Sequence, residues 1–257
     1  MKMAFSKPTD NTVEQQVLFS RYHSFGYQGL QLKNGQYREY VDDPARFVEQ
    51  WGKDAPAIAS GLITGGLLDE TGIASLRSLF KFAQTVGTER IIFCHAQPRQ
   101  GLSRDDIKGF AQVLSELGKE AQQYRTVLSL HHHYNQPVMY CEDFEVFFDA
   151  VSDQSVTLTV DTAHLIKSGI NDIAGVLRDY RHVLDNVHLK DITDGAFKVL
   201  GQGNIDFAPV FAALHEIGYA GWLCADEESG SDLLGAMEEC ARFVANSWQQ
   251  HSHEAIN

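Results

Sequence analysis

The sequence predicts an α/β fold: a closed eight-stranded barrel of the (β/α)8, or TIM, type that forms a single domain over residues 1–257. Strand-like and helix-like segments alternate from end to end, and each of the eight pairs takes about 30 residues. No Pro-, Gly- or Ser-rich linker and no low-complexity tract interrupts them. The alternative, an open doubly wound sheet, normally carries an early G-x-G-x-x-G or P-loop turn, and this sequence has neither. The closed barrel is therefore favoured.

The expected strands are short apolar runs, several of which show the period of two that a strand imposes. They cover 3–7, 29–33, 58–64, 90–95, 126–133, 156–161, 183–191 and 221–228. The expected helices cover 13–25, a segment that opens at Asp43-Pro44, 72–86, 103–124, 142–151, 173–180, a segment that runs through 217, and 233–248. Residues 249–257 are polar and are expected to form a frayed tail.

Local signals at helix ends support these boundaries. Asp43 is an acidic cap in front of a proline at the first helical position. Gly87 stands where a helix C-terminus favours glycine. Ser103 and Asp106 resemble a capping box in which Asp replaces Glu.

Composition limits the function classes. The net charge of −13, from 34 acidic and 21 basic residues, argues against a protein that lives on nucleic acid or on an anionic membrane. The four cysteines form no C-x-x-C pair, which is typical of a reduced, cytoplasmic chain. No apolar run is long enough for a signal peptide at the N-terminus or for a membrane span. We expect a soluble cytoplasmic protein.

The run 156–161 ends on Asp161, and His164 follows three residues later. A carboxylate at a strand tip with an imidazole on the next loop suits a divalent metal and its substrate. By itself, however, a D-x-x-H pattern is more often a helix cap or a surface turn. The metal interpretation depends on three other strands that end in the same way.

In a TIM barrel the carboxyl ends of the strands form the catalytic face. The alternation of apolar and polar residues directs polar side chains of four neighbouring strands toward that face. Burying so many ionisable groups together costs several kcal/mol unless a cation neutralises them. The predicted metal ligands are His131, Asp161, His188, Asp226 and Glu228.

Two choices among these ligands stay open: His131 or His133, and Asp226 or Glu228. The mixed nitrogen and oxygen donors favour Mn²⁺, Co²⁺ or Zn²⁺, with Fe²⁺ and Mg²⁺ as alternatives.

Several motifs resemble the xylose isomerase-like barrel family, which includes sugar-phosphate isomerases and epimerases, hydroxypyruvate isomerase, inosose dehydratase and endonuclease IV enzymes. They are LTVDTAH at 158–164, NVHLKD at 186–191, GQGNIDF at 201–207, IGYAGWLCADEE at 217–228 and FGYQGLQLK at 25–33. The resemblance covers essentially the whole chain and is more specific in the second half. It implies metal binding by Asp161 and His188, and substrate contacts by His164 and Lys190.

The chain departs from the family pattern at two positions. The strand-five position is commonly glutamate in the family but is His131 here, within the run His131-His132-His133. The strand-eight glutamate of G-W-x-x-x-E is Asp226, with Glu228 in phase two residues later. These departures speak against a plain two-glutamate epimerisation, and the H-H-H ending looks more like the inosose dehydratase branch.

The resulting hypothesis is a metal-dependent isomerase or epimerase acting on a small keto-sugar, sugar phosphate or cyclitol ketone through a metal-stabilised enediolate. The alternative is an inosose-type dehydratase that starts from the same proton abstraction. Asp226 or Glu228 is the expected base, with His164 or His131 as its partner acid.

Further substrate contacts are expected from lysines and histidines. Lys190, and less directly Lys198, would stabilise negative charge or bind a substrate anion. His133 and His95 are the other candidates, although a core position for His95 is an equal alternative.

Two remote classes remain. An apurinic endonuclease needs a three-zinc cluster, yet 58–69 contains no histidine and 201–207 lacks the D-x-H motif. A catalytically silent sugar-binding barrel would leave the ionisable strand ends without a purpose. Homodimers are common in the family, so a homodimer is an open expectation.

Overall fold

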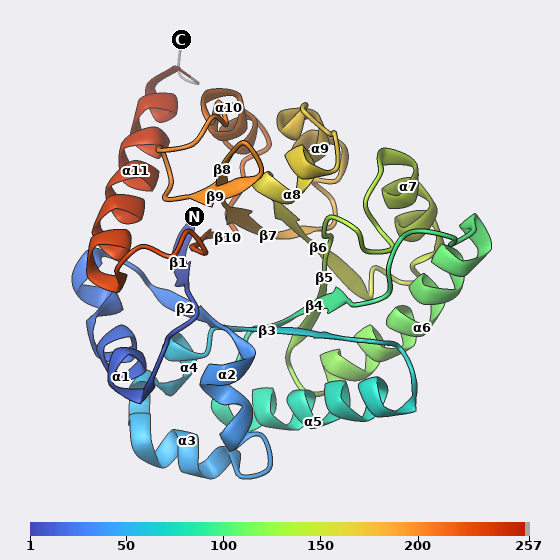
Figure 1. Ribbon diagram of the computed structural model, residues 1–257. Helices are drawn as coiled ribbons and strands as arrows, with labels where there is room; N and C mark the ends of the chain where they lie inside the picture. Colours follow the sequence, from blue (N-terminus) through green and yellow to red (C-terminus); the bar gives the residue numbers. More distant parts are fainter. Residues whose placement is uncertain (255–257) are drawn as a thin grey trace. The chain divides into compact units, whose positions relative to one another are not determined.

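A computed structural model describes residues 1–254 of the chain, with side chains described to residue 250 (Figure 1). Eight strands form a closed barrel in the order β1-β10-β7-β6-β5-β4-β3-β2, so the predicted fold class is confirmed. They are β1 (Lys2–Ser6), β2 (Gly29–Leu32), β3 (Gly61–Gly66), β4 (Arg90–His95), β5 (Val127–His131), β6 (Val156–Asp161), β7 (Leu184–Leu189) and β10 (Trp222–Asp226).

The chain divides into two compact units whose boundaries fall inside β2 and β6. Unit 1 comprises residues 1–30 and 160–257, and unit 2 comprises residues 31–159.

In unit 1, β10 lies between β1 and β7, and Cys224 pairs in register with Ala4 on one side and His188 on the other. The helices are α1 (Thr12–Arg21), α8 (Thr162–Lys167), α9 (Ile173–Asp179), α10 (Ala208–Glu216) and α11 (Leu233–Glu254), with a 3-10 turn at Tyr22–Phe25. Helix α10 packs against both α9 and α11 (Figure 1).

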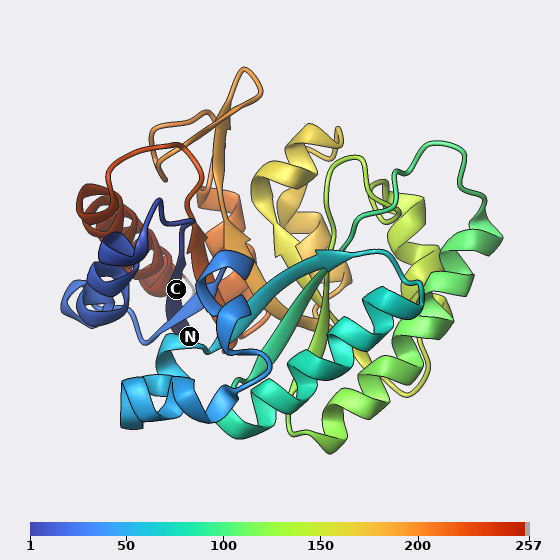
Figure 2. The same cartoon turned by 60° about the horizontal axis from the view of Figure 1, so that its bottom comes forward.

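In unit 2, β4 pairs with β3 on one side and β5 on the other. The helices are α2 (Asn34–Tyr37), α3 (Pro44–Trp51), α4 (Ala55–Ile58), α5 (Glu70–Val86), α6 (Arg104–Gln123) and α7 (Cys141–Ala150), with 3-10 turns at Arg38–Tyr40 and Gly52–Asp54. Helices α5 and α6 lie side by side (Figure 2). Phe80 and Phe82 of α5 and Phe47 of α3 are fully buried, and the rings of Phe47 and Phe82 pack edge-on with centroids 5.6 Å apart.

Most of the predicted helix ends are confirmed. The Ser103 hydroxyl accepts the Asp106 N–H, and the Asp106 carboxylate accepts the Ser103 N–H, which completes the capping box of α6. Gly87 ends α5 in the left-handed region at φ +88°. Asp43 precedes Pro44 as expected, but its side chain makes no capping hydrogen bond.

Several elements differ from the prediction. The fifth strand ends at His131 rather than at residue 133, and the first helix ends at Arg21, followed by a 3-10 turn. The third strand begins at Gly61 rather than at residue 58, because Pro56 starts the short helix α4. Helix α8 follows Asp161 directly, and a hairpin of β8 (Asp191–Thr193) and β9 (Ala196–Lys198) follows β7. Helix α11 continues to Glu254, so residues 249–254 are helical where a frayed tail was expected. The rest of the expected tail, residues 255–257, lies outside the described residues.

Over residues 1–254, no helix combines the length and the apolar character that a bilayer crossing requires.

Candidate active site

Three strands of unit 1 end in side chains that could hold a metal ion. Asp161 closes β6, His188 lies near the end of β7, and Asp226 closes β10. One donor atom from each lies within 4.8 Å of the others, and all three side chains are buried. Two carboxylates and an imidazole at this spacing fit a single divalent cation.

The strand phase explains why these polar groups meet. On β7 and β10, Val187, Leu189, Leu223 and Ala225 are fully buried and alternate with the polar positions. Since Cys224 pairs with His188, the parallel register brings Asp226 level with Lys190, the residue that follows the end of β7. The period of two therefore separates a packing face from a face that collects ionisable groups.

Asp161 uses its two carboxylate oxygens differently. Oδ1 accepts the His164 N–H at 2.9 Å and caps α8, whereas Oδ2 lies 3.6 Å from Lys190 Nζ. The helix-cap interpretation of D-x-x-H is thus correct for Oδ1, and the second oxygen faces Lys190. His164 is buried on the first turn of α8.

Lys190 is the cation at the centre of this cluster. Its Nζ lies 2.7 Å from Asp226 Oδ2 and 2.9 Å from Glu228 Oε2. Burial alone would lower the pKa of Lys190, but the three carboxylates Asp226, Asp161 and Glu228 outweigh it and raise this pKa well above its ordinary value. Lys190 is therefore a fixed positive charge.

The backbone of Lys190 is also fixed. Its N–H donates to the Thr162 hydroxyl at 2.9 Å, and that hydroxyl donates to the Lys190 carbonyl at 2.7 Å. This reciprocal pair ties the end of β7 to the first residue of α8, so His164 and Lys190 keep a constant spacing.

The neighbouring glutamates of the strand-eight motif point to different partners. Glu228 contacts Lys190 and keeps 33% of its side chain exposed. Glu227 is buried, where Oε2 accepts from Lys7 Nζ at 2.6 Å and Oε1 accepts from the Ser229 N–H at 2.7 Å. Glu228 also lines a pocket of about 340 Å³ with Lys7, Pro8, Asp10, Glu14, Gly230 and Ser231. Of the two, only Glu228 is placed to meet a ligand.

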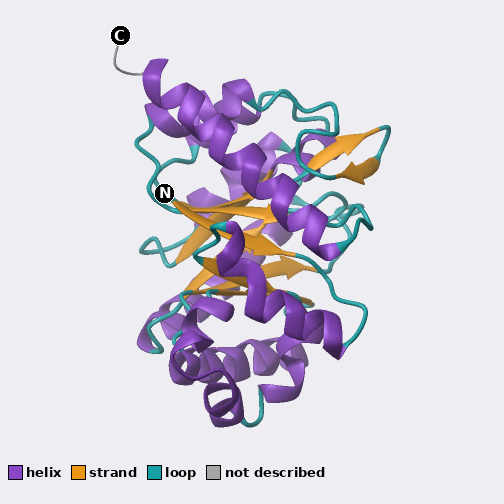
Figure 3. Cartoon of the chain, turned by 90° about the vertical axis from the view of Figure 1, so that its left-hand side faces the viewer, coloured by secondary structure: helices purple, strands orange, loops and turns teal. Residues whose placement is uncertain are grey.

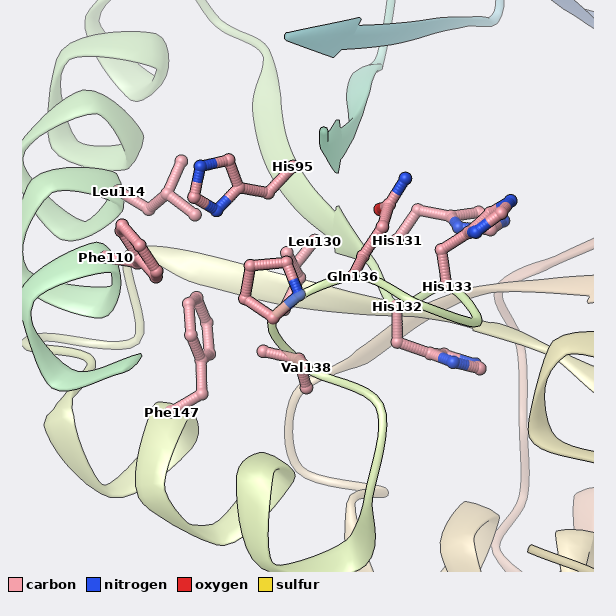
Figure 4. Close-up of a pocket in the computed structure, with 11 residues that line it drawn as sticks. His95, Phe110, Leu114, Leu130, His131, His132, His133, Gln136, Val138 and Phe147 are labelled. Atoms are coloured by element: carbon pink, nitrogen blue, oxygen red, sulfur yellow. The ribbon is translucent and has the colours of Figure 1, made fainter. Parts of the chain in front are cut away.

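Four histidines of unit 2 line a small cavity of about 10 Å³ at the ends of β4 and β5 (Figure 4). His131 and His132 are buried, whereas His133 is half-buried and bonds through Nδ1 to the Tyr134 carbonyl at 2.7 Å. The ring centroids of His131 and His133 are 5.9 Å apart, and His132 packs on Phe144. His131, the last residue of β5, is thus the better buried of the two alternatives at this position.

His95 belongs to the apolar side of the same cavity. Its ring meets Phe110 of α6 edge-on at 4.3 Å, and Leu114 lies beside it (Figure 4). Burial lowers the pKa of His95 to about 4. Both observations favour the alternative interpretation of His95 as a neutral core residue.

Lys198 lies on β9 and is exposed, and neither an ion pair nor a ring contact is found for it within the described residues. Sequence reasoning missed two features of this site. The Lys7–Glu227 pair joins residues 220 positions apart and leaves no local pattern. Phe197, on the hairpin, contacts His164, and the Asp194-Gly195 turn beside it was the available signal.

Comparisons with known proteins agree with this architecture. The model of the family described as xylose isomerase-like TIM barrel matches residues 19–246. An inosose dehydratase of Clostridium tetani (strain Massachusetts / E88) is 34% identical over 155 residues, which are 53% of this chain and 52% of that protein. One from Glaesserella parasuis serovar 5 (strain SH0165) is 27% identical over 266 residues, covering 89% of this chain and 87% of the relative.

For the Clostridium tetani relative, the chain spans about half the length of the protein it matches. Two solved structures share the fold. L-ribulose 3-epimerase gives a TM-score of 0.79 at 17% identity, covering 99% of this chain and 97% of that one. The IolI protein with a binding zinc atom gives a TM-score of 0.77 at 18% identity, covering 98% and 99%.

Proposed function

We propose a function from one established premise: this chain belongs to the xylose isomerase-like TIM barrel family. It is a divalent-metal-dependent enzyme that removes a proton from the carbon next to the ketone of a small polyol. Its leading reaction is the dehydration of a cyclitol ketone of the inosose type. The observation that carries the proposal is the convergence of Asp161, His188 and Asp226 within 4.8 Å.

His131 is proposed as the fourth ligand. It pairs in register with Thr159 on β6, and Asp161 follows two residues later on the same face of that strand. An imidazole there keeps a metal donor where the family commonly has glutamate. When bound, the cation would withdraw electron density from the substrate carbonyl and stabilise the negative charge that develops on its oxygen.

Glu228 is the proposed base. With Asp226 committed to the metal, Glu228 is the carboxylate that both contacts Lys190 and lines an open pocket. The ammonium group of Lys190 orients this carboxylate through their 2.9 Å contact and adds positive charge beside the developing oxyanion. His164, buried at the start of α8, is the proposed partner acid and substrate contact.

Dehydration needs one base and one acid. The base takes a proton from the carbon next to the carbonyl, a carbon–carbon double bond forms, and the neighbouring hydroxyl leaves as water after it receives a proton. Glu228 and His164 fill these two roles. The sequence relatives named inosose dehydratase support this reaction over an epimerisation that would use a glutamate on each substrate face.

Isomerisation or epimerisation of a keto-sugar or sugar phosphate is the second candidate. Asp226 and Glu228 both contact the same ammonium group, so a proton taken from one carbon could return through the carboxylate pair to its neighbour. Cytoplasmic location, a homodimer, and the absence of nucleic-acid and membrane partners stay predictions.

The test is turnover of 2-keto-inositol and of a ketohexose panel by metal-free protein and by protein loaded with Mn²⁺, Co²⁺ or Zn²⁺. Enone absorbance reports dehydration, and incorporation of solvent deuterium without it reports isomerisation. His188→Ala should lose bound metal and at least about a hundredfold in kcat/KM. His182→Ala, an exposed histidine at the start of the same strand region, is the matched control. Equal activity in both variants would overturn the proposal.

A further inference from the structure

The β8–β9 hairpin follows β7 and projects beyond the end of the strands (Figures 2 and 3), and its Phe197 contacts Lys190 and His164 of the candidate site. Its turn is Asp194-Gly195, with both residues in the left-handed region at φ +50° and +80°. This is the backbone of a two-residue hairpin turn whose twist matches paired strands. Ile192 on β8 pairs in register with Phe197 on β9. The hairpin is therefore a regular element with a defined side-chain orientation.

The base of the hairpin is fixed by one buried carboxylate. Asp191 accepts the backbone N–H groups of Gly201 and Gly203 at 3.0 and 2.8 Å through Oδ2. Its other oxygen accepts those of Ile192 and Ile205 at 2.9 and 3.2 Å. A carboxylate that satisfies four backbone donors holds both ends of the segment from 191 to 205 in one place. Phe197 is consequently presented from a rigid base.

Two ammonium groups and one imidazole lie close to the Phe197 ring. Lys190 Nζ lies 4.7 Å from the ring centroid, and Lys167 Nζ lies 5.0 Å from it. The His164 ring meets it edge-on, with centroids 5.6 Å apart and planes at 75°. An ammonium group over an aromatic face is attracted by the ring quadrupole, and the attraction grows as water is excluded.

We propose that Phe197 is a positioning residue: its ring holds the Lys190 ammonium group against Asp226 and Glu228 and keeps water from it. Four rotatable bonds give lysine many alternative positions, so carboxylates on one side alone do not fix it. The Phe197 ring adds a contact from the hairpin to the same ammonium group, and Lys167 also lies near this ring. This inference rests on the proposed function, in which Lys190 orients the base Glu228.

The first arm of the test measures turnover. Phe197→Leu keeps apolar bulk but loses the quadrupole, so kcat should fall about tenfold, with a smaller change in KM. Phe197→Tyr keeps the ring and should restore kcat. Phe148→Leu, a half-buried phenylalanine on α7, is the matched control and should leave kcat unchanged. Equal kcat in the Leu and Tyr variants would overturn the positioning role.

The second arm needs no substrate. Acetylation by an amine-reactive ester, followed by peptide mass spectrometry, should leave Lys190 protected in the native protein and in Phe197→Tyr. In Phe197→Leu its labelling should rise about tenfold, while exposed Lys53, far from residue 197 in the sequence, labels equally in all proteins and serves as the internal standard. Protection without turnover of any substrate supports the ring contact and overturns only the proposed function. Unchanged labelling of Lys190 in Phe197→Leu overturns the inference even if the enzyme is active.

Discussion

The ammonium nitrogen of Lys190 lies 2.7 Å from Asp226 Oδ2, inside the group of side chains that also offers the candidate metal ligands. Lys190 therefore supplies a permanent positive charge to a buried cluster of carboxylates. Such a cluster is otherwise expensive to bury, because each ionised group loses its hydration. In the proposed enzyme, a bound metal ion would neutralise this cluster together with Lys190.

Replacing Lys190 by Met should make the stability of the protein depend on bound metal. In the metal-free protein, the variant should lose about 3–5 kcal/mol of unfolding free energy, because buried carboxylates lose their partner. Saturating Mn²⁺ should recover part of that loss, since ligand binding stabilises the folded state. Urea unfolding with and without Mn²⁺ measures both quantities. Lys198→Met, on an exposed lysine, is the control, and a loss that Mn²⁺ leaves unchanged would contradict the prediction.

The adjacent glutamates should respond in opposite ways to the same substitution. Glu228→Gln should lower kcat by about 10²–10⁴ with little change in stability, because it removes the proposed base from a partly exposed position. Glu227→Gln should lower the unfolding free energy by about 3 kcal/mol, because it leaves the buried Lys7 charge without its ionic partner. Kinetic and denaturation measurements on both variants test this prediction. A large loss of kcat in Glu227→Gln, with kcat unchanged in Glu228→Gln, would show that Glu227 is the base.

Replacing a glycine by alanine should have opposite effects on stability at Gly203 and at Gly109. A Cβ at Gly203 would lie 2.1 Å from Asp191 Oδ1, so Gly203→Ala should cost about 2–3 kcal/mol and increase hydrogen exchange across 200–206. A Cβ at Gly109, inside α6, would meet nothing within 4 Å. Gly109→Ala should therefore stabilise the protein by about 0.5–1 kcal/mol. Thermal unfolding compares the two, and a neutral Gly203→Ala would mean that the Asp191 anchor is dispensable.

His95 predicts an acid-sensitive contribution to stability. Its folded-state pKa of about 4 lies below the ordinary 6.5, so the unfolded chain binds a proton first as the pH falls. The stabilisation is complete above pH 6.5 and declines as the pH falls toward 4, by about 2–3 kcal/mol in total. His95→Leu should flatten this part of the pH profile of unfolding free energy. If the unfolding free energy of His95→Leu falls with pH as steeply as before, another group causes the acid sensitivity.

The sequence predicted the barrel and the polar residues at three neighbouring strand ends because both depend on local alternation; their role as metal ligands stays a proposal. Val187 and Leu189 set the phase of β7, and that phase alone sends His188 to the other face. The same reasoning placed Asp161 and Asp226. What alternation does not reveal is a contact between distant segments, and the Lys7–Glu227 pair is such a contact.

The helix α8 and the β8–β9 hairpin were missed for another reason. Both are shorter than the window in which periodicity can be recognised, so only their turn and cap residues can predict them from the sequence. Asp194-Gly195 is a standard two-residue hairpin signal, and Asp161 is a standard cap. The sequence allows Asp161 to be a ligand or a cap; the structure shows the cap, and the ligand role of the same carboxylate stays a proposal.

The cap and the proposed ligand role together limit which residues can replace Asp161. One oxygen of Asp161 is committed to the amide of His164, so the side-chain length that suits a cation is also the length that starts the following helix. Glutamate or histidine here would preserve a donor atom yet unravel the turn that carries His164. In the proposed site, a change of ligand type should therefore be tolerated better at the end of β5, where His131 stands, than at Asp161.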